Sequence, residues 1–280
     1  MRICSYILPT GVRSYGALEG DAIVDASDDL RNEFPDVRAL LAASALSRLG
    51  EGQARFSVSD VTLTPPIPNP DKIICVGLNY MSHIKETGRE TPKFPSIFIR
   101  HASSLVGHEA PLRMPNASHQ FDYEGELAII IGKPAHNVGV DEAMSVVSGY
   151  TCFNDGSVRD FQRHTSQFWA GKNFVASGSM GPGLTLRDEV PDYTQCVLKT
   201  TVNGVVVQEA PLSDLAFDVA QLVSYISSVT ELLPGDVIAT GTPGGVGIFR
   251  TPPLWLKPGD QVSVEISGVG RLNNTVQFYR

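Results

Sequence analysis

Three acidic side chains have the type and spacing of a metal site. Glu124 and Glu126 stand two residues apart at the start of the segment Glu124–Ile131. Residues two apart in a β-strand project from one face, so the two carboxylates would lie side by side, and Gly125 would leave the opposite face bare. Neighbouring carboxylates near a core repel each other, and a hard divalent cation would relieve that repulsion. A solvated acidic edge strand would show the same pattern.

Asp155 favours the metal interpretation. It follows the apolar segment Val146–Phe153 and precedes Gly156. An aspartate before glycine at a strand end is also a common turn residue. Together with Glu124 and Glu126, however, it completes a set of three oxygen ligands, the donor type that suits Mg²⁺, Mn²⁺ or Ca²⁺.

A second pair could move protons. The segment from Asn79 to Glu86 is typical of a short helix that ends at Gly88, and it places His83 and Glu86 three residues apart on one helix face. A carboxylate beside an imidazole orients the ring and raises its basicity, which is the arrangement of a water-activating pair. A solvated histidine–glutamate pair on an exposed helix has the same spacing.

Mostly strands must position these residues. Periodicity predicts strands at Ile3–Leu8, Ala22–Asp25, Lys72–Val76, Ser96–Arg100, Glu124–Ile131 and Val146–Phe153, and helices at Val37–Leu49 and Leu215–Val229. Two hairpins are expected, one over Val197–Gln208 with Asn203-Gly204 at its turn, and one joining Gln261–Ile266 to Asn273–Phe278. This pattern predicts an α+β fold with a β-rich core, not a dinucleotide-binding fold of alternating strands and helices.

The chain divides at a proline-rich stretch. Residues 64–70 carry closely spaced prolines, which block helices and interior strands alike. We therefore expect a small N-terminal α/β domain over residues 1–63, a linker at 64–70 and a catalytic domain over 71–280.

Composition excludes some partners. The 280 residues carry a net charge of -8, with 22 basic and 30 acidic side chains. A nucleic-acid partner would need a surplus of lysine and arginine, and a membrane span would need about 20 consecutive apolar residues, which the chain lacks. The start has no signal-peptide pattern, and the four cysteines form no CxxC motif. We expect a cytoplasmic protein with reduced thiols.

Five segments in one order resemble the fumarylacetoacetate hydrolase family. They are Val76-Gly77-Leu78-Asn79-Tyr80 with His83 and Glu86, Asp122-Tyr123-Glu124-Gly125-Glu126-Leu127-Ala128, Asn154-Asp155 with Arg159-Asp160 and Gln162, Gly171-Lys172-Asn173-Phe174, and Gly241-Thr242-Pro243-Gly244-Gly245-Val246-Gly247. Any one of them would be a weak signal. The resemblance covers roughly residues 65–280, and one departure is Leu78, where some relatives carry arginine.

The resemblance implies a β-roll-like catalytic domain that is usually a homodimer, with Mg²⁺ or Mn²⁺ at Glu124, Glu126 and Asp155. It makes His83 and Glu86 a dyad on a lid segment and puts Lys172 beside the metal and the substrate. Arg159, Gln162, Thr242 and Tyr80 match substrate-side positions. Composition alone would allow Lys172 to be a surface lysine.

The resemblance also sets the expected reaction. We expect hydrolysis of the C–C bond of an acylpyruvate, such as fumarylpyruvate or a related product of aromatic ring cleavage, to pyruvate and a carboxylic acid. The same metal–enolate chemistry serves oxaloacetate decarboxylation and the tautomerisation, isomerisation or hydration of 2-oxo acids, so these stay open. A non-catalytic binder is a further alternative. Arg89 and Lys93 in the expected lid hint at a second substrate carboxylate.

Overall fold

Strands dominate the fold, as the sequence predicts. The computed structural model describes residues 1–50, 52, 54–86, 90 and 92–278, with only the backbone at Glu86. Its largest sheet comprises, within these residues, β1 (Arg2–Ile7), β2 (Arg13–Glu19), β3 (Ala22–Asp25), β4 (Arg55–Ser57), β5 (Thr62–Leu63), β6 (Ile73–Gly77), β7 (Ser96–Arg100), β8 (Leu105–Val106), β11 (Gly125–Ile131), β12 (Val147–Asn154), β14 (Gly178–Leu186) and β17 (Val237–Ala239). The order along it is β4-β3-β2-β1-β14-β12-β11-β17-β6-β7, with β5 beside β1 and β8 beside β14.

A second sheet packs against the first. Its order is β16 (Val205–Pro211), β15 (Val197–Val202), β18 (Gln261–Ile266), β19 (Gly270–Phe278) and β9 (Leu112–Met114), and a separate short pair joins β10 (Phe121–Asp122) to β13 (Ser157–Val158). One apolar cluster takes Leu127 and Ile129 from β11 together with Leu198 and Val264 from the second sheet. The larger body of the protein is therefore β-sandwich-like, and its core lies between two sheets.

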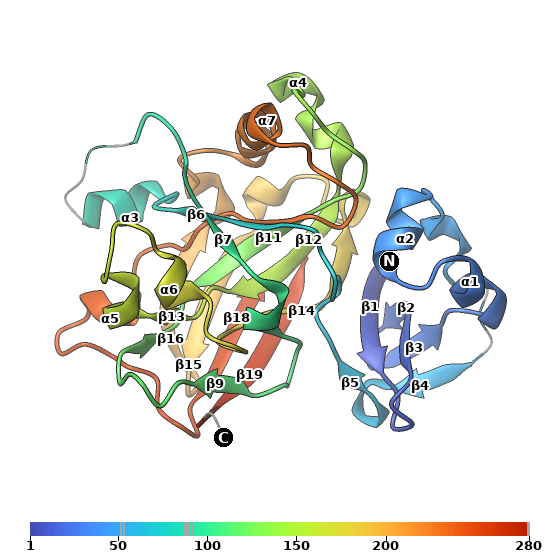
Figure 1. Ribbon diagram of the computed structural model, residues 1–280, viewed down its shortest axis with the longest axis horizontal. Helices are drawn as coiled ribbons and strands as arrows, with labels where there is room; N and C mark the ends of the chain where they lie inside the picture. Colours follow the sequence, from blue (N-terminus) through green and yellow to red (C-terminus); the bar gives the residue numbers. More distant parts are fainter. Residues whose placement is uncertain (51, 53, 87–89, 91, 279–280) are drawn as a thin grey trace.

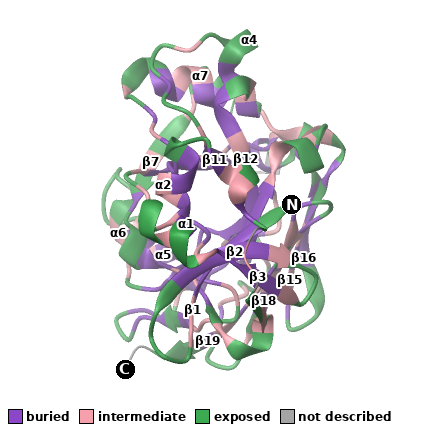
Figure 2. Cartoon of the chain, turned by 90° about the vertical axis from the view of Figure 1, so that its right-hand side faces the viewer, coloured by how far each residue is buried: buried purple, intermediate pink, exposed green. Residues whose placement is uncertain are grey.

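Helices are short and lie outside the sheets. They are α1 (Asp28–Glu33), α2 (Val37–Ala42), α3 (Met81–Glu86), α4 (Val140–Ala143), α5 (Arg159–Gln162), α6 (Trp169–Lys172) and α7 (Val219–Val229). Figure 1 shows α4 and α7 side by side on one side of the body. Figure 2 shows buried residues concentrated in the central strands and exposed ones on the outer helices and loops. None of the helices in the described ranges has the length and apolar character that crossing a bilayer requires.

The N-terminal residues form a lobe that continues the large sheet. Figure 1 shows this lobe, in blue, beside the larger body. β1 pairs antiparallel with β14, with Ile3 opposite Leu184, and one apolar cluster holds Ile3 and Leu40 together with Ile130 and Phe153. The proline-rich stretch is also packed, since Ile67 is buried and the Pro66 carbonyl accepts a hydrogen bond from Ser5. The lobe and the body thus share one sheet and part of one core.

Several local expectations differ from the structure. The predicted helix Val37–Leu49 ends at Ala42, because Ser44 takes a φ of 54° and reverses the chain. The Ser44 N–H then donates to the Leu41 carbonyl, and the Ala45 N–H donates to the Leu40 carbonyl. This is the Schellman ending, here without glycine. Strands β2 and β14, among others, were missed, and the helix expected over Leu215–Val229 begins at Val219. The predicted Asn203-Gly204 hairpin is confirmed, with both residues at positive φ between β15 and β16.

Candidate metal centre and active site

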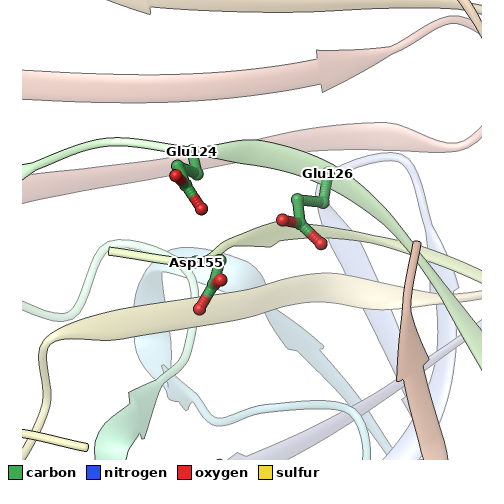
Figure 3. Close-up of side chains that lie close together, drawn as sticks. All are labelled: Glu124, Glu126 and Asp155. Carbon is green, nitrogen blue, oxygen red and sulfur yellow. The ribbon is translucent and has the colours of Figure 1, made fainter. Parts of the chain in front are cut away.

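Strands β11 and β12 bring the three carboxylates together. In their antiparallel register Gly125 faces Asn154, so Glu124 and Asp155 lie at the same end of the pair, and the Asp155 N–H donates to the Glu124 carbonyl at 2.8 Å. Glu124, Glu126 and Asp155 are all buried, and one carboxylate oxygen of each lies within 4.8 Å of the others. Figure 3 shows the three carboxylates converging from these two strands. The sequence-predicted cluster is thus formed by the fold.

The face opposite the two glutamates is not bare. A Cβ on Gly125 would lie 2.0 Å from Thr200 Oγ1, so glycine is needed for the second sheet to pack closely. The Gly125 N–H donates to Gln208 Oε1 at 3.0 Å, and its carbonyl accepts from Thr242 Oγ1 at 2.9 Å. The glycine is thus a packing requirement that anchors the acidic segment between the sheets.

Three buried cations surround the carboxylates. Lys172 Nζ lies 2.6 Å from Glu124 Oε2 and 2.5 Å from Asp155 Oδ2. Arg159 Nη2 lies 2.7 Å from Glu124 Oε1. On the far side, Arg100 Nη1 lies 2.5 Å from Asp155 Oδ1. Each carboxylate oxygen of Glu124 and of Asp155 therefore forms an ion pair with one of these three cations.

Among the described residues, Glu126 has no such cation. One described partner of its carboxylate is the Gly241 N–H, at 2.9 Å from Oε2. Burial raises the pKa of Glu126 well above its usual value, and the nearby charges of Asp155 and Glu124 add to this. Burial would also raise the pKa of Glu124, but Arg159 and Lys172 outweigh it and lower that pKa to about 2. Burial would lower the pKa of Lys172, yet Asp155 and Glu124 raise it, so the ammonium stays charged.

These residues fit a divalent cation. Three convergent, buried carboxylates are an all-oxygen donor set, and the charge of Glu126 lacks a cationic partner among the described residues. A hard cation such as Mg²⁺ or Mn²⁺ satisfies both features.

A cavity of about 400 Å³ opens onto this cluster. Glu124 and Glu126 lie on its wall together with the expected residues His83, Arg159, Gln162, Lys172 and Thr242. The rest of the wall is mainly apolar and includes Val76, Leu78, Phe98, Phe168, Val246, Ile248 and Phe249. The cavity therefore combines a charged floor with an apolar wall, as small-molecule sites do.

Some of the residues expected at the site need separate comment. Tyr80 does not line the cavity: it is fully buried in the apolar core and pairs with Leu215, so the structure contradicts a direct substrate contact. The reason is that Leu78 takes a φ of 55°, which turns the chain so that residue 78 faces the cavity instead. The Glu86 side chain and Arg89 lie outside the described residues, whereas His83 lies on the cavity wall with its ring centroid 5.9 Å from that of Phe249.

Sequence reasoning missed three buried polar residues around the site. Arg100 ends β7 and holds Asp155. Asp122 binds Arg159 Nε at 2.8 Å and accepts from the Gly247 and Ile248 N–H groups, which fixes the loop after β17. Gln208 donates to Thr242 Oγ1 at 2.8 Å. The sequence signal that could have identified Arg100 as a site residue is its position as a charged residue at the end of the apolar strand Ser96–Arg100.

Comparison with known proteins shows the family of this chain. The family model described as "Fumarylacetoacetate (FAA) hydrolase C-terminal" matches residues 72–277. The oxaloacetate tautomerase fahd2, mitochondrial, of Xenopus laevis is 40% identical over 246 residues, which cover 87% of this chain and 77% of that protein. This chain belongs to the fumarylacetoacetate hydrolase family.

Solved structures that are similar over all of both chains include two enzymes with different names. A 5-carboxymethyl-2-hydroxymuconate delta-isomerase from Mycobacterium smegmatis is 32% identical, with a TM-score of 0.81 and coverage of 100% of each chain. A maleylpyruvate hydrolase from Sphingobium sp. SYK-6 is 29% identical, with a TM-score of 0.77 and the same coverage. Similar proteins thus include a tautomerase, an isomerase and a hydrolase, on one fold.

Proposed function

We propose that this protein is a divalent-metal-dependent enzyme that interconverts the keto and enol forms of oxaloacetate or a similar 2-oxo acid. The observation that carries the proposal is the buried Glu124–Glu126–Asp155 cluster on a cavity that also holds Lys172 and His83. Similarity to an oxaloacetate tautomerase at 40% identity supports tautomerisation over the hydrolysis that the sequence motifs alone favoured. Mg²⁺ or Mn²⁺ is the proposed cofactor.

The residues on the wall have the groups that this reaction needs. A divalent cation held by the three carboxylates would supply Lewis-acid stabilisation of negative charge on the 2-oxo oxygen. Lys172, charged and 2.6 Å from Glu124, would add a fixed positive charge near a 2-oxo oxygen bound at this cluster. His83 is the proposed group for proton transfer at the C3 carbon. Tautomerisation moves one proton between C3 and the 2-oxo oxygen, so it needs no water as a reactant and breaks no C–C bond.

Hydrolysis of an acylpyruvate is the second candidate. It would need a water molecule beside the distal carbonyl of the substrate. His83 lies on the cavity wall, where its imidazole could activate this water. Similarity to a maleylpyruvate hydrolase supports this alternative. The two reactions differ in their products, so product analysis separates them.

The test is to follow the enol absorbance of oxaloacetate and of acetylpyruvate with EDTA-treated protein, before and after Mg²⁺ or Mn²⁺ is added. Metal-dependent acceleration of enol–keto exchange, with no carbon dioxide and no pyruvate formed, is the expected result. Release of carbon dioxide and pyruvate would replace tautomerisation with decarboxylation, and pyruvate with acetate from acetylpyruvate would establish the hydrolase. Absence of any metal-dependent turnover would favour a non-catalytic binder.

We also propose that the protein is a homodimer in the cytoplasm. Strand β7 lies at the end of the large sheet and exposes Ile97 and Ile99, which is a surface that a second copy could cover. Light scattering should give twice the chain mass of 30.2 kDa. A monomer at micromolar concentration would contradict the dimer, and imaging of the tagged protein would test its location.

A further inference from the structure

The cavity wall contains one cation that the buried network does not use. Arg163 lies on this wall just after α5, one helical turn beyond Arg159. Its backbone N–H donates to the Asp160 carbonyl, but its guanidinium has no hydrogen bond or ion pair with any other described side chain. Asp160, the nearest acid in sequence, accepts instead from Ser118 Oγ at 2.7 Å. Arg163 is therefore a charged side chain at the cavity, available to a ligand.

The other two cations on the wall are already committed. Arg159 binds Asp122, Glu124 and Gln162, and Lys172 binds Glu124 and Asp155. Arg159 and Lys172 are thus neutralised by neighbouring carboxylates, whereas Arg163 has no such partner among the described residues.

The charge balance of the site indicates how many negative charges a ligand could bring. With every carboxylate ionised, as a bound cation would favour, the buried groups there are four carboxylates and three cations, a net charge of about -1 from Asp122, Glu124, Glu126, Asp155, Arg100, Arg159 and Lys172. A divalent cation changes this to +1, and the single carboxylate of a 2-oxo acid brings it to zero. A second carboxylate on the substrate would then have no buried charge left to meet it, because the remaining wall is apolar apart from His83, Gln162 and Thr242. Arg163 could provide that charge.

We infer that Arg163 binds the second carboxylate of a dicarboxylic 2-oxo acid and sets the preference of the site for dianionic over monoanionic substrates. This inference rests on the proposed 2-oxo acid site and names the substrate class within it. Arginine is suited to the role, because its planar fork matches the two oxygens of a carboxylate. Arg163 acts on the distal end of the substrate, so it contributes binding energy without taking part in proton transfer.

Two ligands of equal length test the inference without turnover. 2-Oxoglutarate and 2-oxopentanoate share the 2-oxo acid head and five carbons, and differ by a carboxylate in place of a methyl group. Calorimetry on the Mg²⁺-loaded protein should show 2-oxoglutarate binding more tightly by about fivefold, the value expected for one solvent-accessible ion pair. Arg163→Gln should abolish this preference and leave the affinity for 2-oxopentanoate unchanged, and Arg163→Lys should retain part of it.

Arg163 is exposed, so these variants should fold normally, which a thermal melt checks. The matched control is Arg55→Gln, which removes an exposed arginine from the N-terminal lobe and should leave the preference intact. An undiminished preference in Arg163→Gln, an equal loss for both ligands, or no binding of either ligand to the wild type would overturn the inference. If no variant turns over oxaloacetate but the preference depends on Arg163, the proposed reaction fails and the inference stands.

Discussion

Replacing Glu126 with glutamine should affect metal binding and stability in opposite directions. Glutamine has the same shape, and its amide oxygen can still accept from the Gly241 N–H, which now donates to Glu126 at 2.9 Å. The variant loses one of the three carboxylates that converge within 4.8 Å, so its affinity for Mg²⁺ should fall about 100-fold or more.

Without metal, the same change should stabilise the fold. In the described structure Glu126 is the member of the cluster with no cationic partner, whereas Glu124 and Asp155 are paired through both oxygens. The metal-free wild type must either bury the unpaired charge of Glu126 or take up a proton on folding. Glutamine avoids this cost, so the free energy of unfolding should rise by about 1–3 kcal/mol. The new amide can donate to the neighbouring carboxylates, so it is not left without partners.

The assay is a thermal melt in EDTA and in excess Mg²⁺, with calorimetry for the metal. In EDTA the Tm of Glu126→Gln should exceed that of the wild type by roughly 2–10 °C. When Mg²⁺ is present at 100 times the Kd of the wild type, the free energy of unfolding of the wild type should increase by about 2.7 kcal/mol, and that of the variant by much less. Glu209→Gln, at an exposed position, is the matched control and should change neither property. A variant that is less stable in EDTA, or that binds Mg²⁺ like the wild type, would refute the reasoning.

Three further predictions concern the same site. Arg100→Gln leaves the buried Asp155 without one of its two cations, so urea unfolding should show a loss of about 3–5 kcal/mol; a loss under 1 kcal/mol would contradict a structural role for this pair. His83→Ala should lower kcat about 100-fold while calorimetry shows unchanged Mg²⁺ affinity; full activity would remove His83 from proton transfer. In EDTA the folded state binds a proton at Glu126 more tightly than the unfolded state does, because the pKa of Glu126 is raised in the fold. This proton binding contributes fully to the free energy of unfolding below the ordinary pKa of 4.5, and the contribution is lost as pH rises through the higher folded pKa. The Tm of the wild type should therefore fall over that range relative to Glu126→Gln, and parallel Tm curves for the two proteins would argue against the shift.

The sequence determined much of the local structure because its signals are local. The hairpin at Asn203-Gly204 needs only two residues that tolerate positive φ, and the strands around Glu126 and Asp155 follow from apolar runs. The helix expected over Val37–Leu49 was too long because the reversal at Ser44 uses a residue with no strong turn signal. The carboxylates of the candidate metal centre were likewise visible as types and spacings.

Only the tertiary structure decided how those carboxylates are charged and held. Arg100, Asp122 and Lys172 come from separate segments, and their pairing depends on strand register and on α6 packing beside β13. No sequence pattern shows that Lys172 is fully buried between two carboxylates, or that Tyr80 faces the core. Electrostatic interactions depend on distance and burial, which only the folded arrangement defines. The sequence by itself therefore determined which chemistry is available, and the tertiary structure decided which charges are neutralised and which face a ligand.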